Sequence, residues 1–298
     1  MRRLALSACL ILATGACGGG GASAPAATRE TWVVSQLDYP LDATQAEGLG
    51  FDLDGDGTVD NQMGNVFSAL IQASGSGNLD LQGAVDAAVD DGSLVQLIET
   101  RTGAGTALVF QAGTPAIPAC TDPLDPLTCR RHLNGSTHFT AAAAVGPALT
   151  GSGSSSSAFQ AGPGEAVLQF TLMGGPAVAL PLKLARASFT RSGATLDGRV
   201  GGAIPMTAVD GVLVPALLVS IQAAVARDCS GGTCISGSTG EIMLSLFDGN
   251  ADGTVSLAEL QVNSLITTLL RPDVDTNGDL VLDALSMGLG YHLVGAVY

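Results

Sequence analysis

A period of two in the middle of the chain limits its fold more than any other sequence feature. From about Ser93 to Pro205, short runs of alternating residues are separated by Gly, Pro and Ser. In AVLQFTL (166–172) and TLDGRV (195–200), one side of the alternation is apolar or Gly and the other side is mostly polar. Because successive side chains of a strand face opposite sides, these runs predict antiparallel strands with one solvated face.

Helical periodicity precedes this region. Apolar residues recur at spacings of three and four over 63–71 and again over 81–89. Such spacing places them on one face of a helix. Asp80 is suited to cap the start of the second helix, and Gly92 is suited to end it. We expect a helical hairpin connected through SGSGN.

Helical periodicity also follows the β-rich region. The apolar run 212–226 predicts a buried helix capped by Asp210, and it is too short to span a bilayer. An apolar stripe over 262–270 predicts a further helix, which Arg271 and Pro272 would stop.

The acidic residues are concentrated. Of 27 acidic residues, 11 lie in three segments, 52–60, 248–259 and 273–283. Without the two arginines that follow Met1, the chain carries 10 basic residues and a net charge of 10 − 27 = −17. This charge argues against nucleic acid and against an anionic membrane surface as partners. Local repulsion within the three segments requires a countercharge, which divalent cations would supply.

The segment DGNADGTVSLAE (248–259) matches the twelve-residue EF-hand loop, in which oxygen ligands at positions 1, 3, 5, 7, 9 and 12 surround calcium and glycine occupies position 6. Gly253 occupies the sixth position, and Val255 occupies the eighth, where paired loops form a short strand. The expected ligands are Asp248, Asn250, Asp252, the Thr254 carbonyl, Ser256 and Glu259.

The segment DVDTNGDLVLDA (273–284) is a shortened version of this loop. Position 12 is Ala284, so Asp283 would have to close the site. Only residues 260–272 separate the two loops, which predicts one shared helix instead of a standard EF-hand pair. The expected ligands are Asp273, Asp275, Asn277, Asp279 and Asp283.

A third candidate is DLDGDGTVDNQM (52–63). Its twelfth position is Met63, which does not bind calcium, so the site needs a carboxylate or waters from elsewhere. For this segment and for 273–284, the alternative is a solvated Asp-rich turn. The expected ligands are Asp52, Asp54, Asp56, Thr58 and Asp60.

Residues 1–17, MRRLALSACLILATGAC, are a predicted export signal. Two arginines, a short apolar run and small residues lead to Cys17, as in bacterial lipoprotein signals, although Thr14 replaces the usual Leu. Cys17 would then be lipidated and would begin a flexible tether. The alternative is an ordinary signal peptide that is cut near Ala24.

Four cysteines follow the signal, which suggests two disulfides in an exported chain. Three pairings are open. Proximity favours Cys120 with Cys129, and Cys229 with Cys234.

The segments GLGFDLDGDGTVDNQMGNV, LFDGNADGTVSLAEL and RPDVDTNGDLVLDALSMGLG resemble uncharacterised EF-hand-containing envelope lipoproteins of myxobacterial-type genomes. The resemblance covers the two ends of the chain, not its middle. It implies calcium binding and an envelope location, and it implies no activity.

Together these features predict an α+β fold, with an antiparallel β-rich middle, as a sandwich or a single sheet, and helical calcium-loop segments at both ends. The expected divisions are a signal at 1–17, a tether at 18–31, a helical segment at 32–92, a β-rich region at 93–209 and a helical region at 210–298.

The expected function is that of a non-enzymatic, lipid-anchored protein of the cell envelope, at the periplasmic or outer surface of the outer membrane, in which calcium is structural. A calcium-dependent adhesin or a module that binds a glycan or an envelope protein is the first alternative, and an extracytoplasmic hydrolase is the second. The sequence contains neither GxSxG nor a phosphate-binding P-loop motif. His132 and His138 could form a metal or base site, but a polar surface loop explains them more simply.

Overall fold

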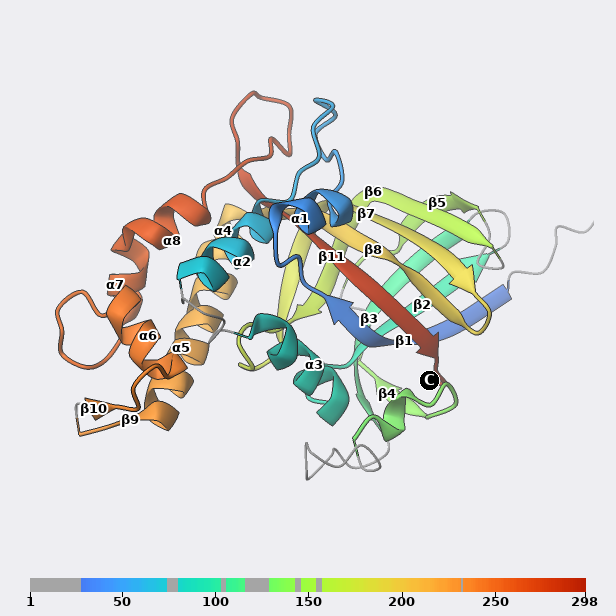
Figure 1. Cartoon of the computed structure of the whole chain (residues 1–298). Helices are drawn as coiled ribbons and strands as arrows, with labels where there is room; N and C mark the ends of the chain where they lie inside the picture. Colours follow the sequence, from blue (N-terminus) through green and yellow to red (C-terminus); the bar gives the residue numbers. More distant parts are fainter. Residues whose placement is uncertain are drawn as a thin grey trace, which may run out of the picture.

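Eight antiparallel strands form a closed barrel in the computed structural model, which describes residues 28–73, 80–102, 106–115, 129–142, 146–153, 157–231 and 233–298. The order around the barrel is β1-β11-β8-β7-β6-β5-β3-β2, and β2 pairs with β1 to close it (Figure 1). β4 (Phe139–Ala141) pairs antiparallel with the end of β3, and β9 (Cys229–Ser230) and β10 (Thr233–Cys234) form a separate hairpin. The barrel strands are β1 (Thr28–Asp38), β2 (Gln96–Thr102), β3 (Thr106–Pro115), β5 (Leu149–Gly153), β6 (Ala158–Phe170), β7 (Val178–Ser192), β8 (Thr195–Pro205) and β11 (Ala284–Gly295).

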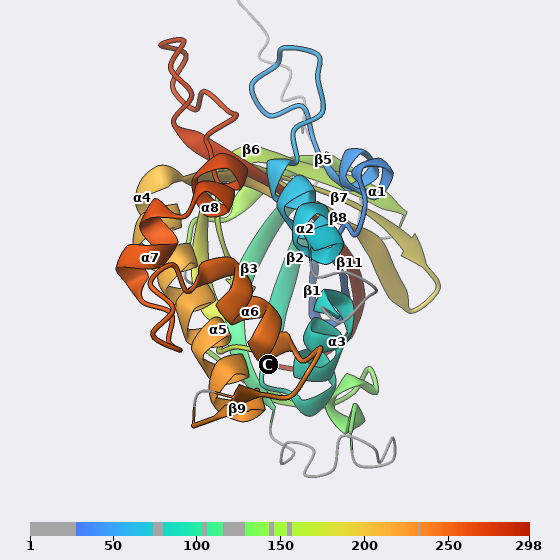
Figure 2. The same ribbon diagram turned by 60° about the vertical axis from the view of Figure 1, so that its left-hand side comes forward.

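Most of the helices gather across one end of the barrel, as Figure 2 shows. Their apolar faces join the barrel interior in one continuous hydrophobic core. The helices are α1 (Ala43–Leu49), α2 (Gln62–Ala73), α3 (Leu81–Asp91), the 3₁₀ turn η1 (Arg131–Leu133), α4 (Met206–Ala208), the π-helical turn η2 (Val209–Leu213), α5 (Val214–Asp228), α6 (Thr239–Phe247), α7 (Leu257–Val262) and α8 (Ser264–Leu269).

An aromatic stack connects the barrel to its helical end. The ring of Tyr39, just after β1, lies 4.9 Å from that of Phe67 on α2 and 5.6 Å from that of Phe170 on β6. The Tyr39 hydroxyl donates to the Thr171 carbonyl at 2.6 Å, so its polar group is satisfied although the side chain is buried. Burial of one such aromatic side chain contributes roughly 2–3 kcal/mol, and the stack holds α2 against the barrel.

The expected α+β fold is wrong, because the structure is mostly β and its sheet closes into a barrel. Two barrel strands, β1 and β11, come from segments that were expected to be tether or helical. The first eight residues of β11 are all buried, and its outer face contacts α1 and α2. A strand that is covered on both faces shows no apolar–polar alternation, so its sequence lacks the period of two.

The strands expected in the middle of the chain and the two N-terminal helices are confirmed. Runs 166–172 and 195–200 lie largely in β6 and β8. Asp80 caps α3 by accepting from the Gly83 amide at 2.7 Å, and Gly92 ends the helix with φ of 78°. Residues 74–79, the expected hairpin connection, lie outside the described residues.

The buried helix expected at 212–226 is confirmed, but it begins earlier than expected. α4, η2 and α5 form one continuous helical segment from Met206 to Asp228, so Asp210 lies inside it and does not cap it. This segment is long and apolar enough to cross a membrane, yet half of its apolar window is buried inside the structure. Core helices of globular domains have the same length and hydropathy, so one such helix is only weak evidence of a membrane span.

The single helix expected between the two C-terminal acidic segments is wrong. Two short helices, α7 and α8, replace it, because Asn263 interrupts the first and caps the second by accepting from the amides of Leu265 and Ile266. Val262 was expected on the buried stripe, but it is 80% exposed.

Candidate metal centre

Three acidic loops, called A, B and C in chain order, carry the predicted ligands. Loop A precedes α2, loop B connects α6 to α7, and loop C leads into β11. Figures 1 and 2 show loops A and C side by side at the rim of the barrel. The limits are 52–60 for loop A, 248–259 for loop B and 275–283 for loop C.

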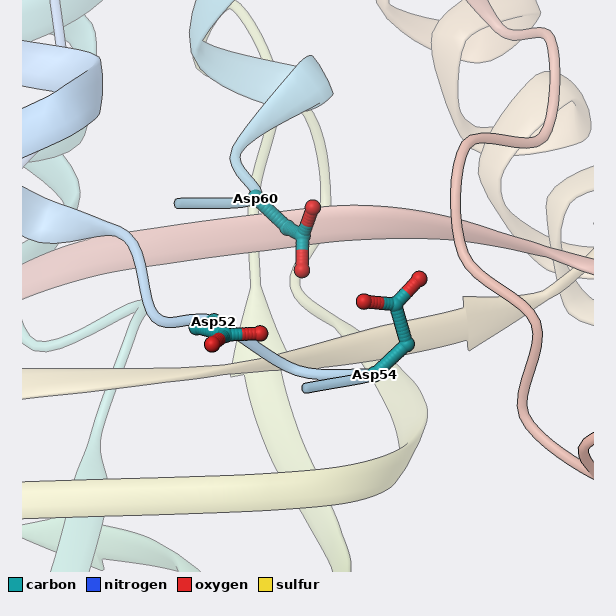
Figure 3. A group of neighbouring side chains, drawn as sticks. All are labelled: Asp52, Asp54 and Asp60. Carbon is teal, nitrogen blue, oxygen red and sulfur yellow. The ribbon is translucent and has the colours of Figure 1, made fainter. Parts of the chain in front are cut away.

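The closest carboxylate cluster lies in loop A. Asp52, Asp54 and Asp60 each offer an oxygen within 4.8 Å of the other two, the only such group of three found among the described residues. Figure 3 shows Asp60, the last residue of loop A, turned toward the carboxylates of Asp52 and Asp54. Carboxylate oxygens in this arrangement suit a hard cation such as calcium.

Backbone amides fix the curl of loop A. Asp52 accepts from the amides of Gly55 and Gly57 at 2.7 and 3.2 Å, and Asp60 accepts from the amide of Leu53 at 2.8 Å. Both glycines have positive φ, of 84° and 89°, which other residues adopt at an energetic cost. The loop is therefore shaped before any ion binds.

Loop C has the same framework. Asp275 accepts from the amides of Gly278 and Leu280 at 2.8 and 2.7 Å, and Asp283 accepts from the amide of Thr276 at 2.9 Å. Gly278 and Leu280 have φ of 78° and 69° and match the two glycines of loop A. Two loops that are distant in sequence thus share one local design.

This correspondence gives loop C a different register from the one expected. Its first position is Asp275, the equivalent of Asp52, and not Asp273. Asp283 is then the equivalent of Asp60, and each is joined through a backbone amide hydrogen bond to the strand-like residue before its loop. In this register the last ligand is the ninth residue of each loop. Neither site then needs a ligand from Met63, after loop A, or from Ala284, after loop C. Asn277, Asp279 and the Val281 carbonyl correspond to Asp54, Asp56 and the Thr58 carbonyl.

Asp273 instead lies between the two loops. Its carboxylate accepts from the amide of Ser286 at 2.7 Å and from the hydroxyl of the same residue. The charge of Asp273 disfavours ionisation of Asp60, and the charge of Asp54 disfavours ionisation of Asp273. Asp273 therefore lies close to loop A. Leu53 and Val274 pack in one small apolar cluster at the bases of the two loops.

Crowding of carboxylates alters their protonation. Partial burial raises the pKa of Asp60 to about 6; the Leu53 amide opposes this increase, and the charges of Asp54 and Asp273 add to it. Partial burial, and then the charge of Asp54, also raises the pKa of Asp273, against the hydrogen bonds from Ser286. The ionised cluster is therefore unfavourable unless a cation neutralises it.

Loop B has the internal bonding expected of its EF-hand pattern. Asp248 accepts from the Gly253 amide at 2.8 Å. Glu259 accepts from the amides of Gly249 and Asn250 at 3.1 and 3.2 Å, so it reaches back across the loop. Its other oxygen accepts from the amide and hydroxyl of Ser256, both at 2.8 Å. Because the Ser256 hydroxyl oxygen in turn accepts from the Glu259 amide at 3.2 Å, the two residues form a capping box for α7.

The remaining ligands of loop B are exposed. Side-chain hydrogen bonds from Thr254 and Asn250 lower the pKa of Asp252. Backbone and side-chain bonds from Ser256 lower the pKa of Glu259. Both groups are therefore ionised at neutral pH and ready to bind a cation.

Loop B does not pair with loop C. Val255, at the position where paired loops form a strand, is 1% exposed, and its carbonyl accepts from the side-chain amide of Gln222 on α5 at 3.0 Å. The loop is thus attached to the helical end of the barrel, while loop C is beside loop A.

The cysteine predictions are met only in part. Cys229 and Cys234 form a disulfide with an S–S distance of 2.05 Å, as expected from proximity. Cys129 is disulfide-bonded, but its expected partner Cys120 lies outside the described residues, as does the lipidation candidate Cys17.

The histidines are arranged differently from the expectation. His132 is buried, and its Nε2 lies 2.9 Å from the Val89 carbonyl, so a polar surface loop does not describe it. The sequence assigns no role to His292, yet its Nδ1 and Nε2 each lie 2.8 Å from a carboxylate, of Asp197 and Asp38 respectively. This group spans β8, β11 and β1. No sequence signal reveals it without the strand pairing.

Comparison with known proteins gives no match: neither a family model nor a curated protein nor a solved structure is similar to this chain.

Proposed function

We propose that this protein is a calcium-binding, lipid-anchored barrel of the cell envelope, and that calcium in loops A, B and C stabilises the rim and the helical end. The observation that carries the proposal is the repeated framework of loops A and C. Asp52 and Asp275 accept equivalent amides, and Asp60 and Asp283 close equivalent curls. In loop A, this curl brings oxygens of Asp52, Asp54 and Asp60 within 4.8 Å of one another.

Calcium chemistry fits this oxygen set. Calcium takes six to eight oxygens from carboxylates, amide carbonyls, backbone carbonyls and water. Loop A offers Asp52, Asp54, Asp56, Asp60 and the carbonyl of Thr58. Asp273 stands close enough to loop A to perturb Asp60, so it is a candidate for a further ligand from the neighbouring segment. Magnesium is less suited, because it demands nearly octahedral geometry and retains waters.

A structural role is favoured over a sensor. Calcium outside the cell is steadily abundant, and extracellular modules with weak affinity remain loaded. Loop B is attached to α5 through Gln222 and Val255, and loops A and C are packed through Leu53 and Val274. Leu53, Val255 and Val274 are all buried, which is not typical of the hinge of a switching element.

Calorimetric titration of calcium into the chain from Gly18 to Tyr298 tests the proposal. Three sites are expected, and Asp52→Ala, Glu259→Gln and Asp275→Ala should each remove one. Glu165→Gln, which changes an exposed acid on β6, is the matched control. Absence of heat in the unmodified chain, or loss of binding in the control, would contradict the proposal.

The lipid anchor is tested separately. In a bacterial host, the full chain should incorporate a radioactive or clickable palmitate and sediment with membranes, and Cys17→Ser should abolish both. Secretion of a soluble product by the unmodified chain would support the ordinary signal peptide cut near Ala24.

Calcium-dependent adhesion is a second candidate, favoured by an apolar tip beside the metal loops. Leu280, Val281 and Leu282 of loop C are 94%, 62% and 50% exposed, and Val59 of loop A is 42% exposed. Calcium would neutralise the acids around this tip and so permit contact with an envelope protein or glycan. Immobilised envelope fractions should then retain the protein in calcium but not in EGTA, and Leu280→Ser with Val281→Ser should reduce retention.

A further inference from the structure

A pocket of about 530 Å³ lies on the outside of the barrel and contains none of the residues of loops A, B or C. The end of β1, the turn that follows it, α1 and α3 form its walls. This volume falls in the range of pockets that bind small molecules, roughly 300–1,000 Å³. The pocket is therefore large enough for a ligand that the calcium loops do not address.

Two carboxylates line the pocket, Asp38 from β1 and Asp86 from α3. Partial burial, and then the charges of Asp90 and Asp38, raise the pKa of Asp86, against the hydrogen bond from Gln82, so Asp38 and Asp86 lie within electrostatic range of each other. No lysine or arginine belongs to the described lining. The charge of Arg130 lowers the pKa of Asp86, but Arg130 forms an ion pair with Asp90.

From outside the lining, His292 pairs with Asp38 and with Asp197, and Arg199 donates to the Gly48 carbonyl. The three acids Asp38, Asp86 and Asp197 thus outnumber these two cations, and the pocket keeps a negative potential.

Neutral amides hold the two segments that carry these carboxylates. Gln82 donates to Asp86 at 2.8 Å and to the Leu37 carbonyl at 2.7 Å, and its oxygen accepts from the Tyr39 amide at 3.0 Å. One glutamine thus fixes α3 to the end of β1 and orients Asp86 at the same time.

Asp38 is oriented from the opposite side. Gln36 donates to its Oδ1 at 2.7 Å, and His292 approaches its Oδ2 at 2.8 Å. His292 is not part of the pocket lining, so it holds the carboxylate from outside. Both acids are therefore preorganised.

The rest of the wall combines apolar and open positions. Leu41, Leu49 and Tyr39 contribute apolar surface. A Cβ added to Gly48 would meet no atom within 4 Å, so space is open at this position of α1. A ligand here would place an aliphatic portion against the leucines and a charged end between the carboxylates.

We propose that this pocket binds a small organic cation, a primary ammonium group on a short aliphatic chain. An ammonium group offers three donors to the two carboxylates and relieves their mutual repulsion. A neutral ligand would leave that repulsion in place, and an anion would increase it. A calcium ion is less suited, because it takes six to eight oxygens and the side chains of Leu41 and Leu49 provide none on their side of the pocket.

Titration with n-pentylammonium chloride, followed by NMR chemical shifts, tests the proposal in the chain from Gly18 to Tyr298. Excess calcium is present, so that the acidic loops are filled and binding there is suppressed. Pentanol and pentanoate serve as neutral and anionic probes of the same length. Saturable shifts of Asp86 and Leu49 amides are expected with pentylammonium alone, at concentrations up to about 10 mM.

Two variants locate the site. Asp86→Asn removes one charge and should weaken binding about tenfold, a loss comparable to that of one charge-assisted hydrogen bond. Gly48→Leu fills the open position, suits a helix, and should abolish binding while the melting temperature is retained. Glu165→Gln is the control and should bind like the unmodified chain.

Equal binding of pentanol, unchanged affinity in both variants, or no saturable shift in the folded protein would overturn the inference. Because calcium binding and pentylammonium binding are measured in separate titrations, failure of one does not imply failure of the other.

Discussion

Replacement of Asp60 by Asn should have opposite effects in the absence and in the presence of calcium. Without calcium, the Asp60 carboxylate is crowded by the charges of loop A and Asp273, so its removal should stabilise the fold. With calcium, the same carboxylate is a proposed ligand, so its removal should reduce the stabilisation that the ion provides. The Asn side chain retains an oxygen that can accept from the Leu53 amide.

The size of the first effect follows from protonation. Partial burial and neighbouring charges raise the pKa of Asp60 from 3.8 to about 6. A tenfold change in proton affinity corresponds to about 1.4 kcal/mol, so full expression of this difference would be about 3 kcal/mol. Because Asp60 is partly exposed, solvent screening reduces the expected gain for Asp60→Asn to about 1 kcal/mol.

The pH dependence has a definite sign. The native state keeps a proton on Asp60 at pH values where the unfolded chain has lost it, so the unfolding free energy falls as the pH rises from 3.8 to about 6. It stays lower at neutral pH. Asp60→Asn should remove this fall, so the variant gains stability over the unmodified chain at pH 7 but not at pH 4.

The size of the second effect follows from mass action. A site that binds only the native state contributes RT ln(1 + [L]/Kd), which is about 1.4 kcal/mol when calcium is at ten times Kd. The variant should therefore gain about 1.4 kcal/mol less from calcium than the unmodified chain. For a chain of this size, each kcal/mol corresponds to a change of about 2–4 °C in melting temperature.

Thermal unfolding followed by circular dichroism, at pH 7 in EGTA and in calcium, measures both effects. The variant should melt above the unmodified chain in EGTA and lose part or all of this advantage in calcium, whereas Glu165→Gln should follow the unmodified chain in both. A lower melting temperature in EGTA would refute the electrostatic reasoning. An undiminished gain from calcium would refute the assignment of Asp60 as a ligand.

Three further substitutions test other parts of the structure. Partial burial lowers the pKa of His292, but its two carboxylate partners outweigh burial and raise that pKa above 6.5. The charged ring therefore stabilises the fold at acidic pH, and this contribution is lost as the pH rises through the raised pKa. His292→Gln should consequently flatten the dependence of the melting temperature on pH. Leu280 is 94% exposed with φ of 69°, so Leu280→Gly should stabilise the fold by about 1 kcal/mol in urea unfolding, whereas Leu282→Gly, at a position without positive φ, should not. Asn61 is buried and exchanges hydrogen bonds with the Gly288 amide and carbonyl at 2.9 and 3.0 Å, so Asn61→Ala should cost about 3 kcal/mol or more in the same assay.

Local features were predictable because their causes are local. The spacing of apolar residues gives α2 and α3, and the side chain of Asp80 and the conformational freedom of Gly92 set the limits of α3. Alternation in 195–200 reveals β8, which has mixed exposure over those residues. The Cys229–Cys234 bridge follows from a separation of five residues.

The barrel could not be predicted in the same way, because its closure depends on pairing between distant segments. β11 lies between β1 and β8, and most of it is buried on both faces, so its sequence resembles any buried apolar run. The same limit applies to the group of Asp38, Asp197 and His292, whose members lie on three neighbouring strands and nowhere near one another in sequence.

The register of loop C could not be predicted from the EF-hand pattern, because loop C follows the pattern of loop A instead. Comparison with the twelve-residue loop starts the segment at Asp273 and leaves positions 9 and 12 without suitable ligands. Comparison with loop A starts it at Asp275, and every oxygen position is then filled through Asp283. The two starting points differ by only two residues and preserve the alternation of acids, so spacing alone does not separate them. The amide that each carboxylate accepts does separate them.

The positions of loops A and C give the proposed calcium sites a specific structural consequence. Asn61, directly after loop A, is bonded to Gly288 of β11, and loop C leads directly into that same strand. β11 is the strand that brings the C-terminal part of the chain between β1 and β8. Calcium in these loops would therefore fix the N-terminal and C-terminal segments where they meet, and repulsion among Asp54, Asp60 and Asp273 would oppose that meeting in its absence. Loss of calcium should consequently weaken the pairing of β11 before that of β6 with β7, which hydrogen exchange of the two strand pairs in calcium and in EGTA would measure.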